Sequence, residues 1–345
     1  MMSARKRLGF FTRLLDDTTP AERYRLAIEQ IVAAENAGFD AAWVAQHHFN
    51  HDEGGLPSPF VFLAAAAART ESIRLGTGIV TLPLDNPLRV AEDATVFDLL
   101  SGGRLELGLG SGGTPSSFIA FGHDSADRGR IHGEHLARLR AALAGEDVGG
   151  GNRLYPDGRD ILGRIWQATF SVDGGRRAGE AGDGLMLSRT QPRPKDNPHA
   201  SLAEIQLPVI EAYLAALPSG IEPRILASRT AFVADKRARA LELAEIGLRR
   251  IADRFAAAGH VRTGDTLQDL VRDFDTHVGE PGDVVASLAA DPVLDIATEI
   301  SFQVHSVDPP HELILRSIEL IGAEVAPALG WRDRPEAAPR LTLAQ

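Results

Sequence analysis

The segment IRLGTGIVTLPLDNPLRVAEDATVFDLLSGGRLELGLG, which runs from Ile73 to Gly110, decides the fold. In it, two apolar runs, Ile73–Val80 and Gly103–Gly110, flank an amphipathic stretch of helical spacing, Pro87–Ser101. The apolar residues of each run are nearly continuous, and continuous apolarity is typical of strands that are covered on both faces. The segment therefore predicts a parallel strand–helix–strand unit.

The same unit recurs along the chain. We predict eight strands, at Leu8–Thr12, Ala41–Ala45, Ile73–Val80, Gly103–Gly110, Arg164–Thr169, Gly184–Ser188, Arg224–Ala234 and Ile300–His305. About eight strand–helix pairs in 345 residues predict an α/β fold of the (β/α)8 TIM barrel type. A doubly wound sheet is the alternative, but it predicts a glycine-rich phosphate loop after the first strand, where this chain has Thr12–Asp16.

Three segments have the composition of insertions into a single barrel domain that covers residues 1–345. They lie at about residues 145–163, 190–199 and 259–280, after the fourth, sixth and seventh predicted strands. The first is rich in Gly and Asp, which indicates a loop. The second contains Pro192, Pro194 and Pro198, which exclude regular structure and predict a mobile loop over the site.

The composition excludes several classes of protein. The chain carries 36 Lys and Arg against 47 Asp and Glu, a net charge of −11, which disfavours nucleic acid or an anionic membrane as a partner. It has no cysteine, which excludes disulfides, thiolate metal sites and a cysteine nucleophile. No apolar stretch reaches the ~18 residues of a membrane span, and the short apolar run after Arg7 does not fit a signal peptide. We expect a soluble, cytoplasmic protein.

The end of the second predicted strand carries titratable groups, and active groups of a barrel lie where its strands end. The sequence there is Gln46-His47-His48. Imidazole titrates near neutral pH, so His47 and His48 are candidates for acid–base catalysis or for hydrogen bonding to a ligand. A metal site that also uses His51 is the alternative; adjacent side chains at a strand end point in opposite directions, which disfavours it.

Other strand ends carry groups that suit an anion. Gly110 and Ser111 follow the fourth predicted strand in a glycine-rich stretch whose free amides can cradle an anion. Ser171 and Gly174 stand at a helix start, where unpaired amides and the helix dipole favour a phosphate. The simpler interpretation is that Ser171 only caps the helix.

Two arginines and two glycines each have two interpretations. Arg128 and Arg130 precede a predicted helix, where either can close on a phosphate or form surface ion pairs. Gly76 and Gly78 interrupt the third predicted strand, which permits either close approach of a flat ligand or tight helix packing outside the barrel.

Four segments, taken in order, resemble the bacterial luciferase-like flavin-dependent monooxygenases, a (β/α)8 barrel superfamily, and within it the FMN-dependent luciferase-like group. They are Ala41–Phe49, Ile73–Pro83 with Asn86, Pro87, Ala91, Glu92 and Asp98 after it, Leu100–Gly110, and Ala181–Ser188. The resemblance extends from about Leu8 to Leu329. The chain departs from the luciferases at Gln46, Gly110, Ser111 and Phe170, where they carry Glu, Cys, Arg and Glu.

The resemblance implies an oxidoreductase that uses reduced FMN, supplied by a separate flavin reductase, and O2 to oxidise a small organic substrate without a metal. It also implies a homodimer, formed through helices near Ser58–Thr70 and Pro87–Ser101. Catalysis is expected at His47, with His48 beside it. Cofactor contacts are expected at the backbone of Thr77, Gly78 and Ile79, where relatives have a cis peptide, at the phosphate contacts Ser171, Gly174 and Arg130 or Arg128, and at Ser188 near the flavin ring.

Three alternatives fit the same residues. The first is an F420-dependent oxidoreductase of the same superfamily, in which hydride transfer replaces oxygen chemistry. The second is a flavin-binding barrel without catalysis. The third is a metal-dependent barrel hydrolase built on His47, His48 and His51.

Overall fold

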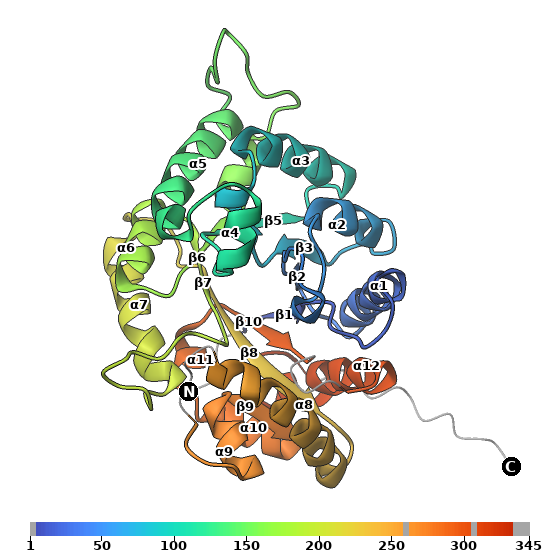
Figure 1. Ribbon diagram of the computed structural model, residues 1–345. Helices are drawn as coiled ribbons and strands as arrows, with labels where there is room; N and C mark the ends of the chain where they lie inside the picture. The colour runs from blue at the N-terminus through green and yellow to red at the C-terminus, as the bar shows by residue number, and fades with distance from the viewer. Residues whose placement is uncertain (1–4, 258–261, 305–308, 334–345) are drawn as a thin grey trace, which may run out of the picture.

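In the computed structural model, which describes residues 5–257, 262–304 and 309–333, eight parallel strands close into a barrel (Figure 1). In order around the barrel they are β1 (Arg7–Thr12), β2 (Ala41–Val44), β3 (Arg74–Thr77), β5 (Leu105–Gly110), β6 (Ile165–Ala168), β7 (Gly184–Leu187), β8 (Ile225–Val233) and β10 (Glu299–Gln303). Strand β10 closes the ring because it pairs with β1 on one side and β8 on the other. The predicted (β/α)8 barrel is confirmed.

Two short strands lie outside this ring. Strand β4 (Val80–Thr81) pairs with the end of β5 after a break at the Gly78–Ile79 peptide bond, which is cis. Strand β9 (Thr276–Gly279) pairs with the second half of β8. It belongs to the predicted insertion 259–280, so this segment extends the sheet; its residues 259–261 lie outside the described residues.

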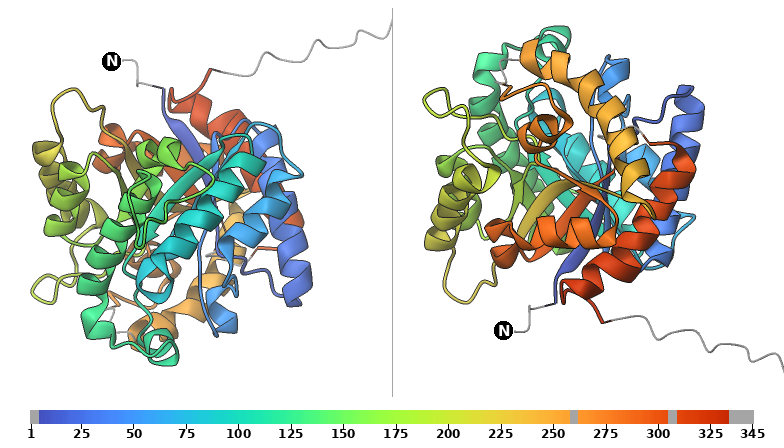
Figure 2. Two further views of the ribbon diagram at one scale, coloured as in Figure 1. Left: turned by 90° about the horizontal axis from the view of Figure 1, so that it is seen from above. Right: turned by 90° about the horizontal axis from the view of Figure 1, so that it is seen from below.

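Helices surround the strands on all sides (Figures 1 and 2). They are α1 (Pro20–Asn36), α2 (Pro59–Ala67), α3 (Pro87–Leu100), α4 (Pro115–Ala120), α5 (Arg128–Leu143), α6 (Val172–Glu180), α7 (Leu202–Ala216), α8 (Arg237–Ala257), α9 (Leu267–Asp273), α10 (Pro281–Ala289), α11 (Pro292–Ile296), α12 (His311–Leu320) and α13 (Ala326–Ala328). The predicted insertion 145–163 leads from α5 into β6. It therefore lies at the end of the barrel where strands begin, away from the candidate site.

Large side chains fill the barrel interior. Trp43 and Trp166 meet edge to face with ring centroids 5.6 Å apart. A Cβ atom at Gly76 would lie 2.3 Å from the Trp43 ring, and one at Gly184 would lie 2.2 Å from the Trp166 ring. Interior indole rings therefore require both glycines. Neither a ligand nor a helix outside the barrel is needed to explain Gly76.

Charged side chains close the end of the barrel where strands begin. Trp43 Nε1 donates a hydrogen bond to Glu299 at 2.6 Å, and Trp166 Nε1 donates one to Glu106 at 2.7 Å. The Arg7 guanidinium lies 3.4 Å from Glu299 and 3.6 Å from Glu106. Burial is the largest influence on Glu299 and raises its pKa to about 7.

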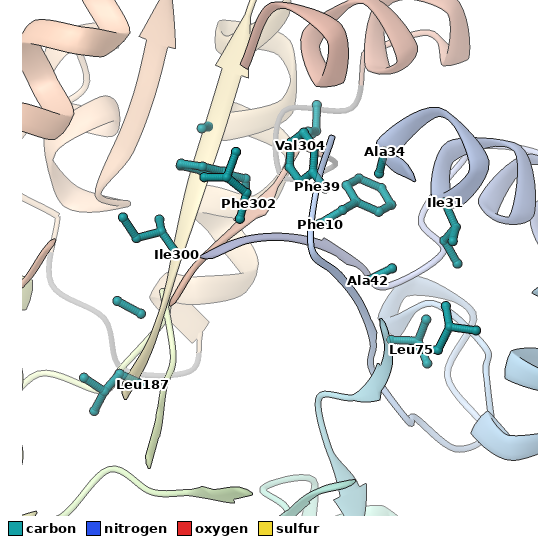
Figure 3. Packing of buried hydrophobic residues seen from close by; sticks show 14 of the residues in the cluster. Phe10, Ile31, Ala34, Phe39, Ala42, Leu75, Leu187, Ile300, Phe302 and Val304 are labelled. Atoms are coloured by element: carbon teal, nitrogen blue, oxygen red, sulfur yellow. The ribbon is translucent and has the colours of Figure 1, made fainter. Parts of the chain in front are cut away.

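The main hydrophobic core lies between strands and helices. Figure 3 shows Phe10 and Ala42 directed from β1 and β2 toward Ile31 and Ala34 of α1, and all four side chains are fully buried. Helix α1 begins after Thr19, whose hydroxyl accepts a hydrogen bond from the Glu22 amide at 3.3 Å. Because outward strand residues pack on helices and inward ones on each other, both strand faces are apolar, as the continuous runs predict.

Candidate active site

The candidate site lies at the mouth of the barrel, the end where the parallel strands finish. Phe11, Ile79 and Ala168 pack on the interior cluster of Trp43 and Trp166 and form the last apolar layer below the mouth. We call this layer the floor. A ligand that enters the mouth rests on it.

One predicted catalytic residue follows a strand end at this mouth. Phe11 of β1 and Trp43 of β2 face the interior, and Arg13 and His47 follow these two strands, which end at Thr12 and Val44. The His47 amide donates to the Leu56 carbonyl at 3.1 Å, which fixes the backbone at the end of β2. His47 is half-buried. This position suits a group that handles a proton above the floor.

His48 has different surroundings. Its ring packs edge to face on Phe121 with centroids 4.9 Å apart. Its Nε2 atom is buried and has no hydrogen-bond partner among residues 5–257, 262–304 and 309–333. Burial lowers the pKa of His48, and the nearby Asp85 carboxylate opposes that change. The ring is therefore neutral at neutral pH and packs mainly against an aromatic neighbour.

Gln46, which differs from the glutamate common in the resembling family, has a structural role. Its Nε2 atom donates to the Pro57 carbonyl at 3.2 Å and to Asp85 at 3.0 Å. Its Oε1 atom accepts from the Thr81 amide at 2.6 Å. These bonds tie the end of β2 to β4 and to the loop that leads into α3.

The Thr77–Ile79 segment presents backbone rather than side-chain groups. The Thr77 hydroxyl donates to the Gly108 carbonyl at 2.7 Å and accepts from the Gly108 amide at 2.9 Å, so it is fully used in joining β3 to β5. The Gly78–Ile79 peptide bond is cis, as the resemblance implies. A Cβ atom at Gly110 would lie 2.9 Å from Ile79 Cδ1, so the Ile79 side chain occupies the space that a larger residue at position 110 needs.

The start of α6 combines a cap with free amides. Ser171 Oγ accepts from the Gly174 amide at 3.1 Å. A Cβ atom at Gly174 would lie 1.8 Å from Thr169 Oγ1, so only glycine fits there. In the described chain, the amides of Val172 and Asp173 donate to no other residue. These unpaired amides at a helix start suit a phosphate.

The two predicted phosphate arginines lie at the start of α5 and are paired within that region. Arg130 is exposed and pairs with Glu134 at 3.0 Å and Asp127 at 3.4 Å. Arg128 donates to the Ser125 carbonyl at 3.0 Å. Neither arginine contacts Ser171 or Gly174, so a bound phosphate has to displace a carboxylate or carbonyl partner to recruit either one.

His132 is a residue near this region that sequence reasoning missed. It lies one turn into α5, and burial, followed by the charges of Arg177 and His135, lowers its pKa to about 4. The influence of Arg177 shows that the charge of this α6 residue acts on the ring of His132. No sequence signal distinguishes this histidine, because its burial depends on a helix more than 40 residues away.

Ser188 and the predicted loop 190–199 cover another part of the mouth. Ser188 Oγ accepts from the Thr190 amide at 3.2 Å, and its carbonyl accepts from Gln206 at 2.9 Å. The loop is anchored by an ion pair between Arg193 and Asp275, whose side chains are mostly buried. Gln191 is buried and donates to the Phe170 carbonyl at 3.3 Å.

Arg189 is a second residue that sequence reasoning did not assign to the site. It is 8% exposed and follows β7 by two residues. Its Nε atom donates to Gln303 at 2.6 Å and its Nη1 atom to Thr230 at 3.3 Å. Burial, and then the charge of Arg13, lower its pKa to about 9. Arg189 thus brings a positive charge into the mouth.

The histidines of the metal alternative do not converge in the described part of the chain. His51 Nε2 lies 3.1 Å from Arg23 Nη2, and its Nδ1 lies 3.0 Å from Asp52, while His48 packs on Phe121. Across the described residues, no three His, Asp or Glu side chains are grouped to hold a metal ion. None of the described helices combines the length and apolar character of a membrane span.

Comparisons with known proteins identify the family. The chain matches the model of the luciferase-like monooxygenase family over residues 8–294. It is 43% identical over 110 residues to 4-hydroxyprotoasukamycin monooxygenase of Streptomyces nodosus subsp. asukaensis, covering 32% of this chain and 29% of that protein. It is 35% identical over 100 residues to the oxygenase component of flavin-dependent trigonelline monooxygenase of Acinetobacter baylyi, covering 29% of this chain and 28% of that protein.

Relatives with a different cofactor also match. The chain is 32% identical over 170 residues to the F420-dependent glucose-6-phosphate dehydrogenase of Beutenbergia cavernae, covering 46% of this chain and 50% of that protein. The stretches shared with these three curated relatives thus span about a quarter to a half of their length.

A solved structure matches along nearly the whole chain. The monooxygenase RslO1 from Streptomyces bottropensis superposes with a TM-score of 0.74 at 27% identity, covering 93% of this chain and 99% of that one. Since the family match also spans most of the 345 residues, the chain belongs to the luciferase-like monooxygenase family of oxidoreductases.

Proposed function

We propose that the protein is the oxygenase component of a two-component, FMN-dependent monooxygenase. Its partners are a separate flavin reductase, O2 and a small organic substrate. When bound, reduced FMN supplies the electrons with which one atom of O2 enters the substrate and the other leaves as water. The flavin-dependent oxygenase component among the relatives supports this proposal.

The start of α6, beside the floor of the mouth, is the observation that carries the proposal. The free amides of Val172 and Asp173 suit a phosphate, and Ala168, only four residues before Val172, belongs to the apolar floor. A ligand with an aromatic ring system and a phosphate tail fits both features at once. The residues present therefore fit FMN, with the ring toward Ile79 and Gly110 and the phosphate near Ser171 and Gly174.

The chain's own residues would have three tasks in this reaction. His47 holds or moves a proton above the floor, because it follows β2 at the mouth and imidazole is the side chain suited to both donating and accepting a proton. Arg130, rather than Arg128, exchanges Glu134 for the phosphate. The loop 190–199 excludes water from the mouth.

Binding of reduced cofactors tests the proposal. Titrated without oxygen, the protein should bind reduced FMN more tightly than reduced F420, and on mixing with O2 the bound flavin should reoxidise at a rate different from that of free reduced FMN. Tight F420 binding without FMN binding would favour the hydride-transfer alternative. Reoxidation at the rate of the free flavin would favour the non-catalytic barrel.

A pair of matched variants tests the phosphate position. Aspartate caps a helix as well as serine does, so Ser171→Asp keeps the fold while placing a negative charge against the phosphate. We expect it to weaken reduced-FMN binding at least tenfold. Thr19→Asp is the control, because the Thr19 hydroxyl caps α1 in the same way, at the Glu22 amide. Equal affinities in both variants would refute the position.

A further inference from the structure

The arginine at the mouth, Arg189, differs from the other arginines that are buried to the same degree. All three side-chain nitrogens of Arg229 have acceptors, one of which is the Asp291 carboxylate at 2.6 Å. Each nitrogen of Arg23 also has a partner, from Asp16 or His51. In contrast, among residues 5–257, 262–304 and 309–333, Arg189 Nη2 has no hydrogen-bond partner and no carboxylate pairs with this guanidinium. Within this part of the chain, Arg189 is therefore a buried cation whose charge is not compensated.

A buried charge without a counterion costs stability, and charges of this kind are found preferentially at functional sites. The two groups that Arg189 contacts, Gln303 and Thr230, are neutral. The charge that acts on it is that of Arg13, which is also positive and does not compensate it. An anion bound to Arg189 would supply the missing opposite charge. The electrostatics of this rim thus favour an anionic ligand.

The position of Arg189 separates it from the proposed phosphate site. Its contacts come from β8 and β10, and Arg13 follows β1, so these groups occupy the side of the mouth formed by β7, β8, β10 and β1. The proposed FMN contacts at Gly78, Gly110 and Ser171 follow β3, β5 and β6 on the other side. One anion, the FMN phosphate, therefore does not serve both places.

The surroundings of Arg189 are those of a covered binding site. A cavity of about 20 Å³ beside it is lined by Thr230 and by Gln191, Arg193 and Asp275, among others. Gln191 is 1% exposed, and its Oε1 atom has no hydrogen-bond partner in the described chain. The cavity has room for about one water molecule, so a larger ligand enters only when the loop 190–199 moves. Both acidic groups in the lining already have partners: Asp275 pairs with Arg193, and Asp273 accepts hydrogen bonds from the Thr263 amide and hydroxyl.

We propose that Arg189, with Arg13 beside it, binds the carboxylate of the organic substrate, so that the substrate class is small organic acids. The substrate's acid group then lies on the β7–β10 side of the mouth, and its remaining carbon atoms extend over the apolar floor. A guanidinium suits this task because its planar fork binds a carboxylate through two hydrogen bonds. The inference concerns the substrate of the proposed function, but the carboxylate site itself does not depend on the flavin.

Binding of matched ligand pairs to the flavin-free protein tests the proposal. The probes are benzoate and octanoate, each compared with its neutral amide, benzamide and octanamide, by isothermal titration calorimetry. We expect at least one carboxylate to bind at least tenfold more tightly than its amide. Arg189→Gln should abolish this preference and Arg189→Lys should keep part of it. Arg237→Gln, which removes an exposed arginine paired with Asp283, is the control and should leave the preference unchanged.

Stability and flavin affinity supply independent readouts. Because Arg189→Gln removes an uncompensated buried charge, it should melt at or above the wild-type temperature. Its affinity for reduced FMN should stay within twofold of wild type. If this variant does not fold, Arg13→Gln takes its place and should weaken carboxylate binding.

Two results would overturn the proposal. One is the absence of a carboxylate preference in the wild type, or a preference that survives Arg189→Gln. The other is a tenfold loss of reduced-FMN affinity in Arg189→Gln without any effect on carboxylates, which would assign the arginine to the flavin. If carboxylates bind as expected but neither FMN nor F420 binds, the proposed function fails and the carboxylate site stands.

Discussion

At the scale of single residues, the two adjacent histidines at the end of β2 have separable roles. His47 follows β2 at the mouth of the barrel, and His48 packs on Phe121. General acid–base help is typically worth about 10²–10⁴-fold in rate, so we expect His47→Ala to slow substrate oxidation by about that factor. Reduced-FMN affinity should stay nearly unchanged, because the proposed phosphate contacts lie elsewhere.

His48→Ala is the matched control for this prediction. It should reduce the rate less, since a neutral ring against an aromatic neighbour contributes packing rather than proton transfer. The measurement is a single-turnover oxidation of substrate by the reduced-flavin complex across neutral pH. A wild-type rate in His47→Ala would show that His47 is structural.

Glu299, at the opposite end of the barrel, should make folding stability depend on pH. Its folded-state pKa is raised from 4.5 to about 7, mainly by burial. The folded protein therefore keeps this proton when the unfolded chain has already lost it, and stability falls as pH rises from about 4.5 to about 7. Glu299→Gln preserves the acceptor for Trp43 and removes the titration.

Thermal or urea unfolding between pH 5 and pH 8 measures this effect. Relative to wild type, Glu299→Gln should gain stability as pH rises, by up to about 3 kcal/mol at pH 8. Glu92 lies on the exposed surface of α3, so the stability difference between Glu92→Gln and wild type should be the same at every pH in this range. A constant difference for Glu299→Gln as well would mean that Arg7 fully compensates the buried carboxylate.

Residue-scale features divide into those that sequence can predict and those that it cannot. His47 was predictable, because a histidine at a strand end in a barrel lies at the mouth. The surroundings of Arg189 were not, because its hydrogen-bond partners Gln303 and Thr230 lie 114 and 41 residues away in the sequence. Gln46 likewise acts through bonds to loops that its own sequence neighbourhood does not specify.

At the scale of elements, an ion pair anchors the loop 190–199. The Arg193–Asp275 ion pair joins the loop to the residue just before β9, and both side chains are mostly buried. Losing one partner leaves the other charge buried and unpaired, which is strongly destabilising locally. We expect Asp275→Asn and Arg193→Gln to raise the opening frequency of the loop at least tenfold.

Trypsin cleavage after Lys195 reports this opening. Lys195 is exposed in the middle of the loop, whereas Arg193 is followed by Pro194 and is a poor trypsin site in the wild type. Cleavage should be faster in each variant, and the double variant should be no faster than the singles, since both remove the same interaction. Arg237→Gln serves as control. Equal cleavage rates throughout would show that the loop does not depend on this ion pair.

The bounds of a helix or strand could be predicted from the sequence where the apolar residues of the whole segment followed one spacing. The third predicted strand, Ile73–Val80, was wrong in its continuity, because the chain breaks at Gly78–Ile79 between β3 and β4. Apolar periodicity carries no information about the geometry of a peptide bond. Strand β9 was missed because Thr276–Gly279 is short and gains its strand form from pairing with β8.

At the scale of the whole molecule, the barrel itself was predictable because strands buried on both faces are nearly continuous runs of apolar residues. The inner layers were not, since the interior Trp43–Trp166 contact joins β2 and β6, which are not neighbours in the ring. The oligomeric state is also a property of the whole molecule.

We propose that the protein forms a homodimer through α2 and α3. These helices pack on each other, with Phe60 and Phe97 ring centroids 6.4 Å apart. Their outer surfaces nevertheless expose Val61, Leu99 and Leu100 by 74%, 60% and 72%. An apolar surface of this kind on two adjacent helices suits burial against a second copy across a two-fold axis.

Light scattering at micromolar concentration measures the assembly state. The wild-type mass should be twice the 37.0 kDa of one chain. Leu99→Asp combined with Leu100→Asp should give a monomer, because a carboxylate buried in the interface without a partner costs several kcal/mol. Ile246→Asp is the control, since Ile246 is 59% exposed on α8, away from both helices, and should remain dimeric. A wild-type monomer, or a dimer that tolerates both aspartates, would place the contact elsewhere and leave the exposed leucines without a partner.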